Sequence, residues 1–265
     1  MTTTLTILGC GSSSGVPRFG GDWGQCDPAN ARNRRRRCSV LVEKRASAGS
    51  TCVLIDTSPD MRDQLLSAAV SNIDAVLYTH EHADHTHGID DLRGIFLKNR
   101  RKVPVWADEM TGQMLMTRFG YCFYTAPDSD YPPILGLNRL AAGTPVVIDG
   151  AGGRVTALPV RLHHGNIEAL GFRIGSTAYT PDVNGIPEES VAALEGLDLW
   201  IVDALKRTPH PSHFSLAETL VWIERLKPKR AVITNMHIDL DFETLRTELP
   251  PNVEPAYDGM TLTIV

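Results

Sequence analysis

The sequence lacks any apolar stretch that approaches the ~20 continuous residues of a membrane-spanning helix. Its first segment, residues 1–8, alternates in the manner of a short strand and has no signal-peptide pattern. We therefore expect a soluble, cytoplasmic protein with no membrane partner.

Paired cysteines are also missing. The five cysteines are scattered along the chain, and none forms a Cys-x-x-Cys pair; they are Cys10, Cys26, Cys38, Cys52 and Cys122. Such a set indicates neither a disulfide framework nor a cysteine zinc site.

The chain has no excess of positive charge, since its net charge is −5 and its pI is about 6.0. This balance argues against long nucleic acid as a partner, because bulk electrostatic attraction to phosphates needs a basic protein. One local exception is the basic run formed by Arg32 and Arg34 to Arg37. It is interpreted either as a solvated charged face or as a source of one or two arginines for a phosphate.

What the sequence does contain is Thr-His-Glu-His-Ala-Asp-His-Thr-His-Gly at residues 79–88, directly after a strand-like apolar run at 73–78. His80 and His82 alternate around Glu81 and can point the same way, whereas Asp84 and His85 can aim at a second point. Imidazole and carboxylate ligands suit zinc, manganese or iron. The segment therefore predicts a metal site, with two metals conceivable, and His87 is interpreted as lying outside the pattern.

Other segments have more ordinary interpretations. The turn Gly9 to Pro17 lacks the lysine of a P-loop and is either a tight turn or a backbone anion site. Asp56 ends a strand and either caps it or orients a metal-bound histidine. Ser58 or Asp60 is expected to cap a helix that runs through Ala69, and residues 121–136 are expected to form a loop over the site.

The pattern His-x-His-x-Asp-His followed by glycine resembles the signature of the metallo-β-lactamase superfamily. The stretch from Gly9 to Val42 further resembles one branch, the phosphodiesterases that act on phosphoribosyl 1,2-cyclic phosphate. The resemblance covers the whole chain and implies an αββα sandwich, with two mixed β-sheets flanked by helices, in a single domain over residues 1–265. Some family members hold an extra zinc near the first loop, but only Cys26 remains here, so we expect no structural zinc.

The resemblance also implies the remaining ligands. It assigns His164, rather than His163, to the first metal together with His80 and His82. It makes Asp182 the carboxylate that bridges both metals, although a helix N-cap is the alternative for this residue. Asp84 and His85 are assigned to the second metal, and His213 is placed beside the substrate phosphate as a proton donor.

One position departs from the family pattern. Asn235 stands where a histidine ligand of the second metal is usual, and His237 lies two residues further on. If the backbone is extended, His237 projects on the same side and is expected to replace the missing ligand.

These residues predict an enzyme, a phosphodiesterase that uses two divalent metal ions, manganese or zinc with iron as a further option. Its catalytic residues would be His213 and Asp84, and its substrate would be a small cyclic phosphodiester of a phosphorylated sugar or nucleotide. Alternatives are an RNase Z-like nuclease that processes tRNA 3′ ends, a thioester or lactone hydrolase, and a non-catalytic nucleotide-binding protein. The sequence leaves the oligomeric state open, and a homodimer is one option.

Overall fold

The computed structural model describes residues 2–125 and 127–264, so that Met1, Ala126 and Val265 lie outside it. Within these residues two seven-stranded sheets face each other. The first sheet has the order β14 (Thr261–Ile264), β1 (Thr2–Gly9), β2 (Ser39–Ala46), β3 (Gly49–Ile55), β4 (Ala75–Leu77), β5 (Val103–Ala107) and β6 (Leu135–Arg139). The second has the order β13 (Val253–Pro255), β12 (Arg230–Thr234), β11 (Leu199–Asp203), β10 (Thr177–Thr180), β9 (Ile167–Ile174), β8 (Val155–His164) and β7 (Val146–Ile148).

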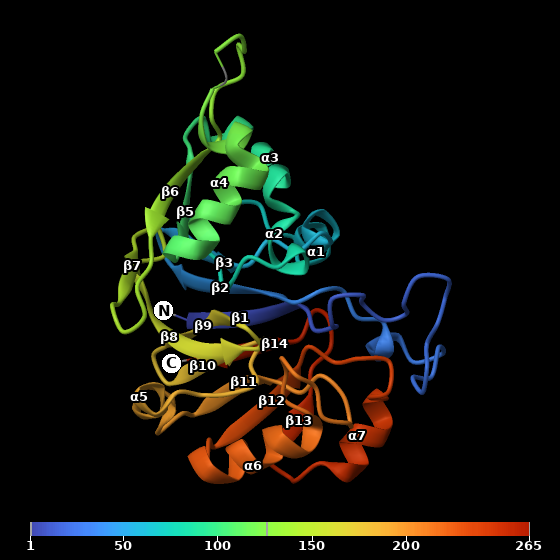
Figure 1. Ribbon diagram of the computed structural model, residues 1–265. Helices are drawn as coiled ribbons and strands as arrows, with labels where there is room; N and C mark the ends of the chain where they lie inside the picture. Colours follow the sequence, from blue (N-terminus) through green and yellow to red (C-terminus); the bar gives the residue numbers. More distant parts are fainter. Residues whose placement is uncertain (1, 126, 265) are drawn as a thin grey trace.

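Helices cover the outer face of each sheet (Figure 1). On the first sheet lie α1 (Met61–Ser67), α2 (Ala83–Thr86), α3 (Arg93–Asn99) and α4 (Glu109–Phe123). On the second lie α5 (Glu188–Val191), α6 (Leu216–Leu226) and α7 (Phe242–Glu248), and short 3₁₀ turns occur at Ala31–Asn33, Ile89–Leu92 and Ala192–Leu194. The mixed sheets flanked by helices confirm the predicted αββα sandwich.

The largest hydrophobic core lies between the two sheets. Alternate residues of β1 such as Leu5 and Ile7 are fully buried there and pack with residues of the second sheet such as Phe172 and Ile201. The opposite face of the first sheet packs a second core against its helices, with Leu54 and Val76 at its centre. Because β3, β4 and β5 are parallel and buried on both faces, they appear in the sequence as short continuous apolar runs.

The helix after Thr57 differs from the expectation. It begins at Met61 and ends at Ser67, and neither Ser58 nor Asp60 caps it through a side chain. The Asp60 carboxylate instead accepts a hydrogen bond from the backbone N–H of Arg37 and forms an ion pair with its guanidinium. The Ser58 hydroxyl donates to Gln64 at 2.9 Å, so both capping groups are occupied elsewhere.

The sequence predicts a loop over the site for residues 121–136. A loop does connect α4 to β6 within this segment, but its predicted place over the site is wrong. Its first residues belong to α4, where Cys122 is fully buried, and its last belong to β6. The connection between α4 and β6 projects at the top of the molecule in Figure 1, and none of its described residues lines the metal pocket. Burial of Cys122 and Phe123 against the second core holds this stretch in the helix although it shows no apolar period.

Candidate metal centre

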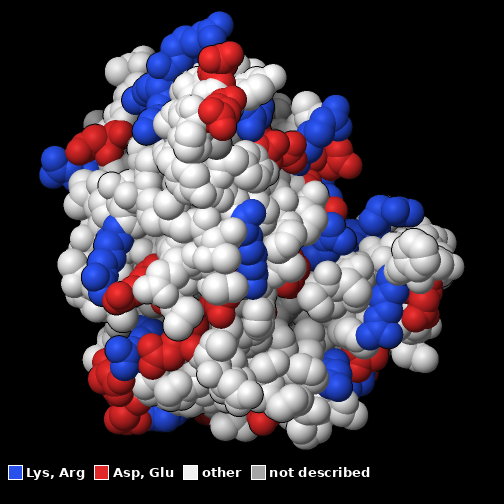
Figure 2. All heavy atoms as spheres, turned by 45° about the horizontal axis from the view of Figure 1, so that its top comes forward, with Lys and Arg blue, Asp and Glu red and all other residues white. Residues whose placement is uncertain are grey.

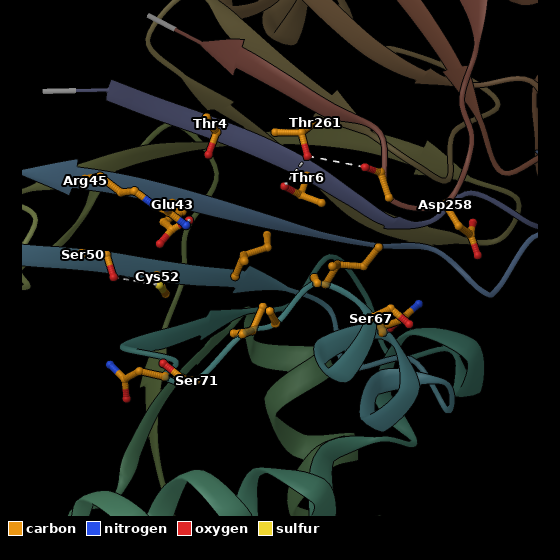
Figure 3. Close-up of a pocket in the computed structure, with 18 of the residues that line it drawn as sticks. Thr4, Thr6, Glu43, Arg45, Ser50, Cys52, Ser67, Ser71, Asp258 and Thr261 are labelled. Atoms are coloured by element: carbon orange, nitrogen blue, oxygen red, sulfur yellow. Dashed lines mark hydrogen bonds and ion pairs between the residues drawn. The ribbon is translucent and has the colours of Figure 1, made fainter.

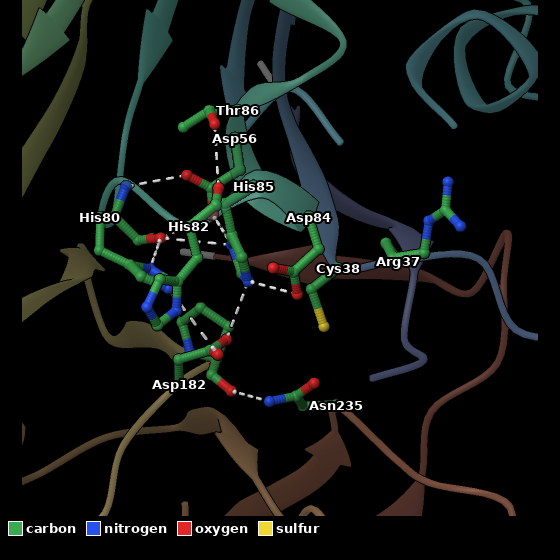
Figure 4. A network of polar contacts seen from close by, with 12 residues as sticks. Arg37, Cys38, Asp56, His80, His82, Asp84, His85, Thr86, Asp182 and Asn235 are labelled. Carbon is green, nitrogen blue, oxygen red and sulfur yellow. Dashed lines mark hydrogen bonds and ion pairs between the residues drawn. The ribbon is translucent and has the colours of Figure 1, made fainter. Parts of the chain in front are cut away.

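The residues of the histidine motif follow the end of β4. His80 is fully buried, and His82 forms an extended N-cap of the short helix α2, which carries Asp84 and His85. Helix α2 turns His85 back toward the sheet while the extended segment before it points His80 and His82 into the same space (Figure 4). One strand end and one helical turn thus supply four of the predicted donors.

Residues from the second sheet complete the cluster. His164 is the last residue of β8, Asp182 follows β10, and His213 lies just before α6. Three groups of donor atoms lie within 4.8 Å of one another: His80, His82 and His164; His80, His85 and Asp182; and His164, Asp182 and His213. The two sheets therefore meet at one cluster, which their separate sequence segments predict only in part.

Each buried histidine is fixed through the ring nitrogen that faces away from the cluster. The Thr79 hydroxyl donates a hydrogen bond to Asp56, and the same hydroxyl oxygen lies 3.0 Å from Nδ1 of His80. Asp56 lies 2.7 Å from Nδ1 of His85, and the carbonyl of Ser212 lies 2.6 Å from Nδ1 of His164. These acceptors place a proton on Nδ1, so Nε2 of each ring faces the cluster and can bind a metal when it carries no proton.

The atoms left over fit a metal. Nε2 of His80 is buried without a hydrogen-bond partner, and Nε2 of His85 and Oδ1 of Asp182, which lie 3.1 Å apart, are buried with no partner other than each other. Nε2 of His164 lies 3.1 Å from Nδ1 of His82, a contact that either an N–H of His82 or a shared metal ion would satisfy. Buried polar atoms are normally paired, so this many unpaired donors at one point fits the chemistry of divalent metal ions.

Electrostatics also favour this arrangement. Burial and the neighbouring charge of His85 lower the pKa of His80, which keeps the ring neutral as a ligand must be. The pKa of His164 is lowered by burial as well. Burial raises the pKa of Asp182, but the positive charge on His85 outweighs it and holds that pKa well below its usual range, so Asp182 is a carboxylate.

Asp182 touches both sides of the cluster. One of its oxygens lies 3.1 Å from Nε2 of His85, and the other lies 3.9 Å from His80 and 3.7 Å from His164. Helix α5 begins later, after Pro187, so Asp182 does not serve as its N-cap. Asp84 approaches the same centre from α2, with Oδ2 at 3.5 Å from Nε2 of His85.

His213 and Asp203 form a hydrogen-bonded pair at the edge of the cluster. Nδ1 of His213 lies 2.8 Å from Oδ2 of Asp203, at the end of β11. Burial raises the pKa of Asp203 to about 7. Burial lowers the pKa of His213, but the Asp203 carboxylate outweighs this and raises it to about 9.

The structure does not bring His237 into the donor groups. Nε2 of His237 contacts the Arg18 guanidinium, and Nδ1 lies 3.3 Å from Asp239. Asn235 adopts a left-handed conformation with φ of 61° and donates to the carbonyl of Pro181, so the backbone is not extended between the two positions. The prediction that His237 completes the second metal site stays a prediction.

The basic run does not reach this pocket. Arg35 is buried and donates to backbone carbonyls, Arg36 pairs with Asp258, and Arg37 pairs with Asp60, as its position in Figure 4 shows. Arg34 lies over the ring of Trp23. These four arginines therefore hold the loops, and the suggestion that they contact a phosphate is not supported by their contacts.

Sequence reasoning missed other residues that line the pocket, whose volume is 450 Å³: Ser12, Ser13, Ser14, Arg18, Leu205, Lys206, His210 and Ser212. The glycine- and serine-rich turn indicated that the serines could belong to a site. No sequence pattern indicated Arg18, because only the fold brings the first loop to the segment near residue 237.

A larger hollow of 890 Å³ lies elsewhere, on the helix side of β1, β2 and β3 (Figure 3). Threonines and the Arg36–Asp258 pair line it, and it contains no histidine. Its polar wall offers no cluster of metal ligands, so the smaller pocket beside the histidines is the candidate site.

Comparison with known proteins agrees with this geometry. Residues 51–238 match the model of the beta-lactamase superfamily domain. The crystal structure of a diphosphatase from the PhnP family is 36% identical and superposes with a TM-score of 0.89, covering 100% of this chain and 98% of that one. The chain belongs to the beta-lactamase superfamily and, within it, to the PhnP family.

Two further matches share only the fold or only part of their length with this chain. PqqB from Methylobacterium extorquens, solved with bound Zn²⁺, is 17% identical with a TM-score of 0.72, covers 98% of this chain and 100% of that one, and shares the fold. The octanoyltransferase of Porphyromonas gingivalis (strain ATCC BAA-308 / W83) is 34% identical over 263 residues, which are 97% of this chain. The chain spans only about half, 51%, of that curated relative. Among the described helices, none combines the length and apolar character needed to cross a membrane.

Proposed function

We propose that the protein is a dinuclear-metal phosphodiesterase that hydrolyses a small cyclic phosphodiester such as phosphoribosyl 1,2-cyclic phosphate. The observation that carries the proposal is the convergence of unpaired histidine and aspartate donors in a small pocket, in a chain of the PhnP family. A pocket of 450 Å³ suits a small molecule rather than a polynucleotide.

Two sets of donors would hold the metals. His80, His82 and His164 form one set, Asp84 and His85 form the other, and Asp182 lies between them. When bound, manganese or zinc ions would act as Lewis acids that activate the attacking water and polarise the phosphate. His237 is not placed in either set here, because both of its ring nitrogens already have partners.

The chain's own residues supply the rest of the reaction. The water oxygen forms a new bond to phosphorus while the bond from phosphorus to one ribose oxygen breaks. Asp84 lines the pocket and would orient the water and accept the proton that the water loses as its oxygen bonds to phosphorus. His213, held through Nδ1 by Asp203, would donate a proton from Nε2 to the departing ribose oxygen. The product is a phosphomonoester.

A second candidate function is hydrolysis of a diphosphate. It is favoured by the 36% identical PhnP-family structure, which is described as a diphosphatase. The same donors would serve, because attack on phosphorus is common to both reactions and only the leaving group changes from a ribose oxygen to a phosphate oxygen.

Phosphorus NMR separates these functions. The manganese-loaded protein is incubated with 5-phosphoribosyl 1,2-cyclic phosphate and, separately, with a nucleoside diphosphate sugar. Conversion of the cyclic phosphate to a monoester, absent in His82→Ala, supports the phosphodiesterase. Conversion of the diphosphate alone supports the second function. A protein that binds metal but converts neither compound would contradict both.

A further inference from the structure

Asn235 presents its side-chain amide to the metal cluster from the second sheet. It directly follows β12, at the edge where the parallel strands β10, β11 and β12 end. Only 1% of the residue is exposed, and it lines the metal pocket together with Asp84 and Asp182. A buried amide therefore faces the same space as these two carboxylates.

The nitrogen of this amide fixes its orientation. Nδ2 donates to the carbonyl of Pro181 at 3.0 Å and lies 3.2 Å from Nδ1 of His213. The reversed amide would set its oxygen against the Pro181 carbonyl oxygen, and two acceptors cannot form a hydrogen bond. The amide oxygen therefore points away from Pro181, as Figure 4 shows, and it has no hydrogen-bond partner among residues 2–125 and 127–264.

The backbone at Asn235 is held in an unusual conformation. Its φ of 61° is left-handed, which is uncommon for a residue other than glycine. Hydrogen bonds anchor the chain on both sides of it. The Thr234 carbonyl accepts from the Ala204 amide at 3.0 Å, and the Met236 amide donates to the Cys10 carbonyl at 2.8 Å. Because such conformations persist where the surrounding structure holds them and gather at binding sites, this one supports a role for the side chain in the pocket.

The two carboxylates that share the pocket have only histidines as ion-pair partners. Asp84 lies near His85, and Asp182 lies near four histidines, whereas no lysine or arginine of the described residues pairs with either carboxylate. On the face shown in Figure 2, by contrast, most acidic side chains lie beside basic ones. Two carboxylates and an unpaired amide oxygen thus face a space that suits a cation.

The donor atoms of the two metal sets differ in kind. The first set consists of three histidine nitrogens, from His80, His82 and His164. The second contains one nitrogen, from His85, and the carboxylate oxygens of Asp84 and Asp182. Imidazole suits zinc, whereas carboxylate and amide oxygens suit harder ions such as Mn²⁺. An oxygen donor at residue 235, in place of a histidine nitrogen, therefore favours a different ion at the second site.

We infer that the amide oxygen of Asn235 is a ligand of the second metal, and that this oxygen-rich site takes a harder ion, such as Mn²⁺, than the three-histidine site, which takes Zn²⁺. The inference rests on the two-metal arrangement of the proposed function and names the ligand that replaces the usual histidine. It makes the protein a mixed-metal protein, whose two ions are of different kinds.

Manganese binding tests the ligand without any turnover. Zinc is added at one equivalent per chain to occupy the three-histidine set, Mn²⁺ is titrated in, and electron paramagnetic resonance measures the free Mn²⁺. Asn235→Gly removes the amide and suits the left-handed backbone. It should weaken manganese binding by about ten- to hundredfold, because the number and charge of the ligands set the affinity of an oxygen site.

Asn235→Asp separates a metal ligand from a residue that only positions its neighbour. Aspartate keeps an oxygen donor but cannot donate to the Pro181 carbonyl. This variant should therefore bind manganese at least as tightly as the wild type. The matched control is Asn252→Gly, because Asn252 also donates to a proline carbonyl, that of Pro228, and does not line the pocket. It should change the manganese affinity by less than twofold.

Metal preference provides the second readout. Asn235→His replaces the oxygen by a nitrogen, so the ratio of zinc affinity to manganese affinity at the second site should rise by about tenfold or more. Competition with a chelator measures this ratio.

The outcomes separate this inference from the proposed function. Equal manganese affinity in the wild type and Asn235→Gly would overturn the inference, even if the diester is hydrolysed. Equally weak binding in Asn235→Gly and Asn235→Asp would also overturn it, because the amide nitrogen would then be the group that matters. Manganese binding that depends on an oxygen at residue 235, without hydrolysis of the cyclic phosphate or the diphosphate, would support the ligand and contradict the proposed function.

Discussion

The Arg18 guanidinium contacts Nε2 of His237 across 219 positions of the sequence. Arg18 lies in the first loop, between β1 and β2, and His237 follows β12 of the second sheet. Both residues line the metal pocket, and both ring nitrogens of His237 have partners, Nε2 in Arg18 and Nδ1 in Asp239.

The metal content of a His237→Ala variant follows from this contact. We expect it to keep two ions per chain, because the unpaired donors belong to His80, His85, Asp182 and their neighbours. Atomic emission analysis after dialysis against zinc measures the stoichiometry, with His82→Ala as the variant that loses metal. One ion per chain in His237→Ala would instead support the sequence-based assignment of His237 to the second metal.

Asp56 is expected to set metal affinity without touching the metal. It lies 2.7 Å from Nδ1 of His85 and also accepts from the backbone and the hydroxyl of Thr79. Asp56→Asn keeps the shape but removes the negative charge, so zinc affinity should fall by about 10- to 100-fold. Competition with a fluorescent chelator measures this affinity.

The control for that change is Asp63→Asn on the exposed face of α1. It should leave zinc affinity unaltered. Equal affinities for Asp56→Asn and the wild type would show that His85 is oriented by its packing alone.

Arg35 is expected to stabilise the fold rather than to bind substrate. It is 2% exposed, and it donates to the carbonyls of Leu240 at 2.6 Å and His237 at 3.3 Å. Arg35→Ala would leave these buried acceptors without a donor, so the free energy of unfolding should fall by about 2–4 kcal/mol. Urea denaturation measures the loss.

Arg34→Ala is the matched change one residue away, where the side chain is exposed over Trp23. This substitution should lower the free energy of unfolding by less than about 1 kcal/mol. Similar losses for the two variants would contradict a special role for the buried guanidinium.

Asp241 is expected to make stability depend on pH in the acid range. Its pKa is lowered to about 2, since hydrogen bonds from the backbone of Thr244 and Asp27 and from the Asn33 side chain outweigh the effect of burial. A lowered pKa in the folded state means that the contribution is present above the unfolded value near 3.8 and is lost as pH falls toward 2.

Thermal denaturation of Asp241→Asn tests this dependence, because asparagine still caps α7 but carries no charge. The Tm difference from the wild type should be largest above pH 4 and shrink toward pH 2. A difference that stays constant over this range would show that the charge of Asp241 contributes nothing.

Much of the fold followed from local patterns. The apolar runs before Asp56 and before Thr79 are strands because they are buried on both faces, and the local pair Ser215 and Glu218 forms the capping box of α6. Predictions failed where a distant partner decided the outcome. Asp60 does not cap α1 because Arg37 binds it, and Cys122 lies in a helix because the second core buries it.

The sequence by itself determined the part of the site whose donors lie within a few residues of one another. His80, His82, Asp84 and His85 are brought together by one strand end and one helical turn, and this local geometry has few alternatives. Only the tertiary structure decided which distant residues join them. The packing of two sheets placed His164, Asp182 and His213 at the cluster and turned His237 toward Arg18. It also directed Arg34 to Arg37 away from the pocket. Contacts between side chains that are distant in the sequence depend on the packing of the whole chain, so the local spacing of residues does not predict them.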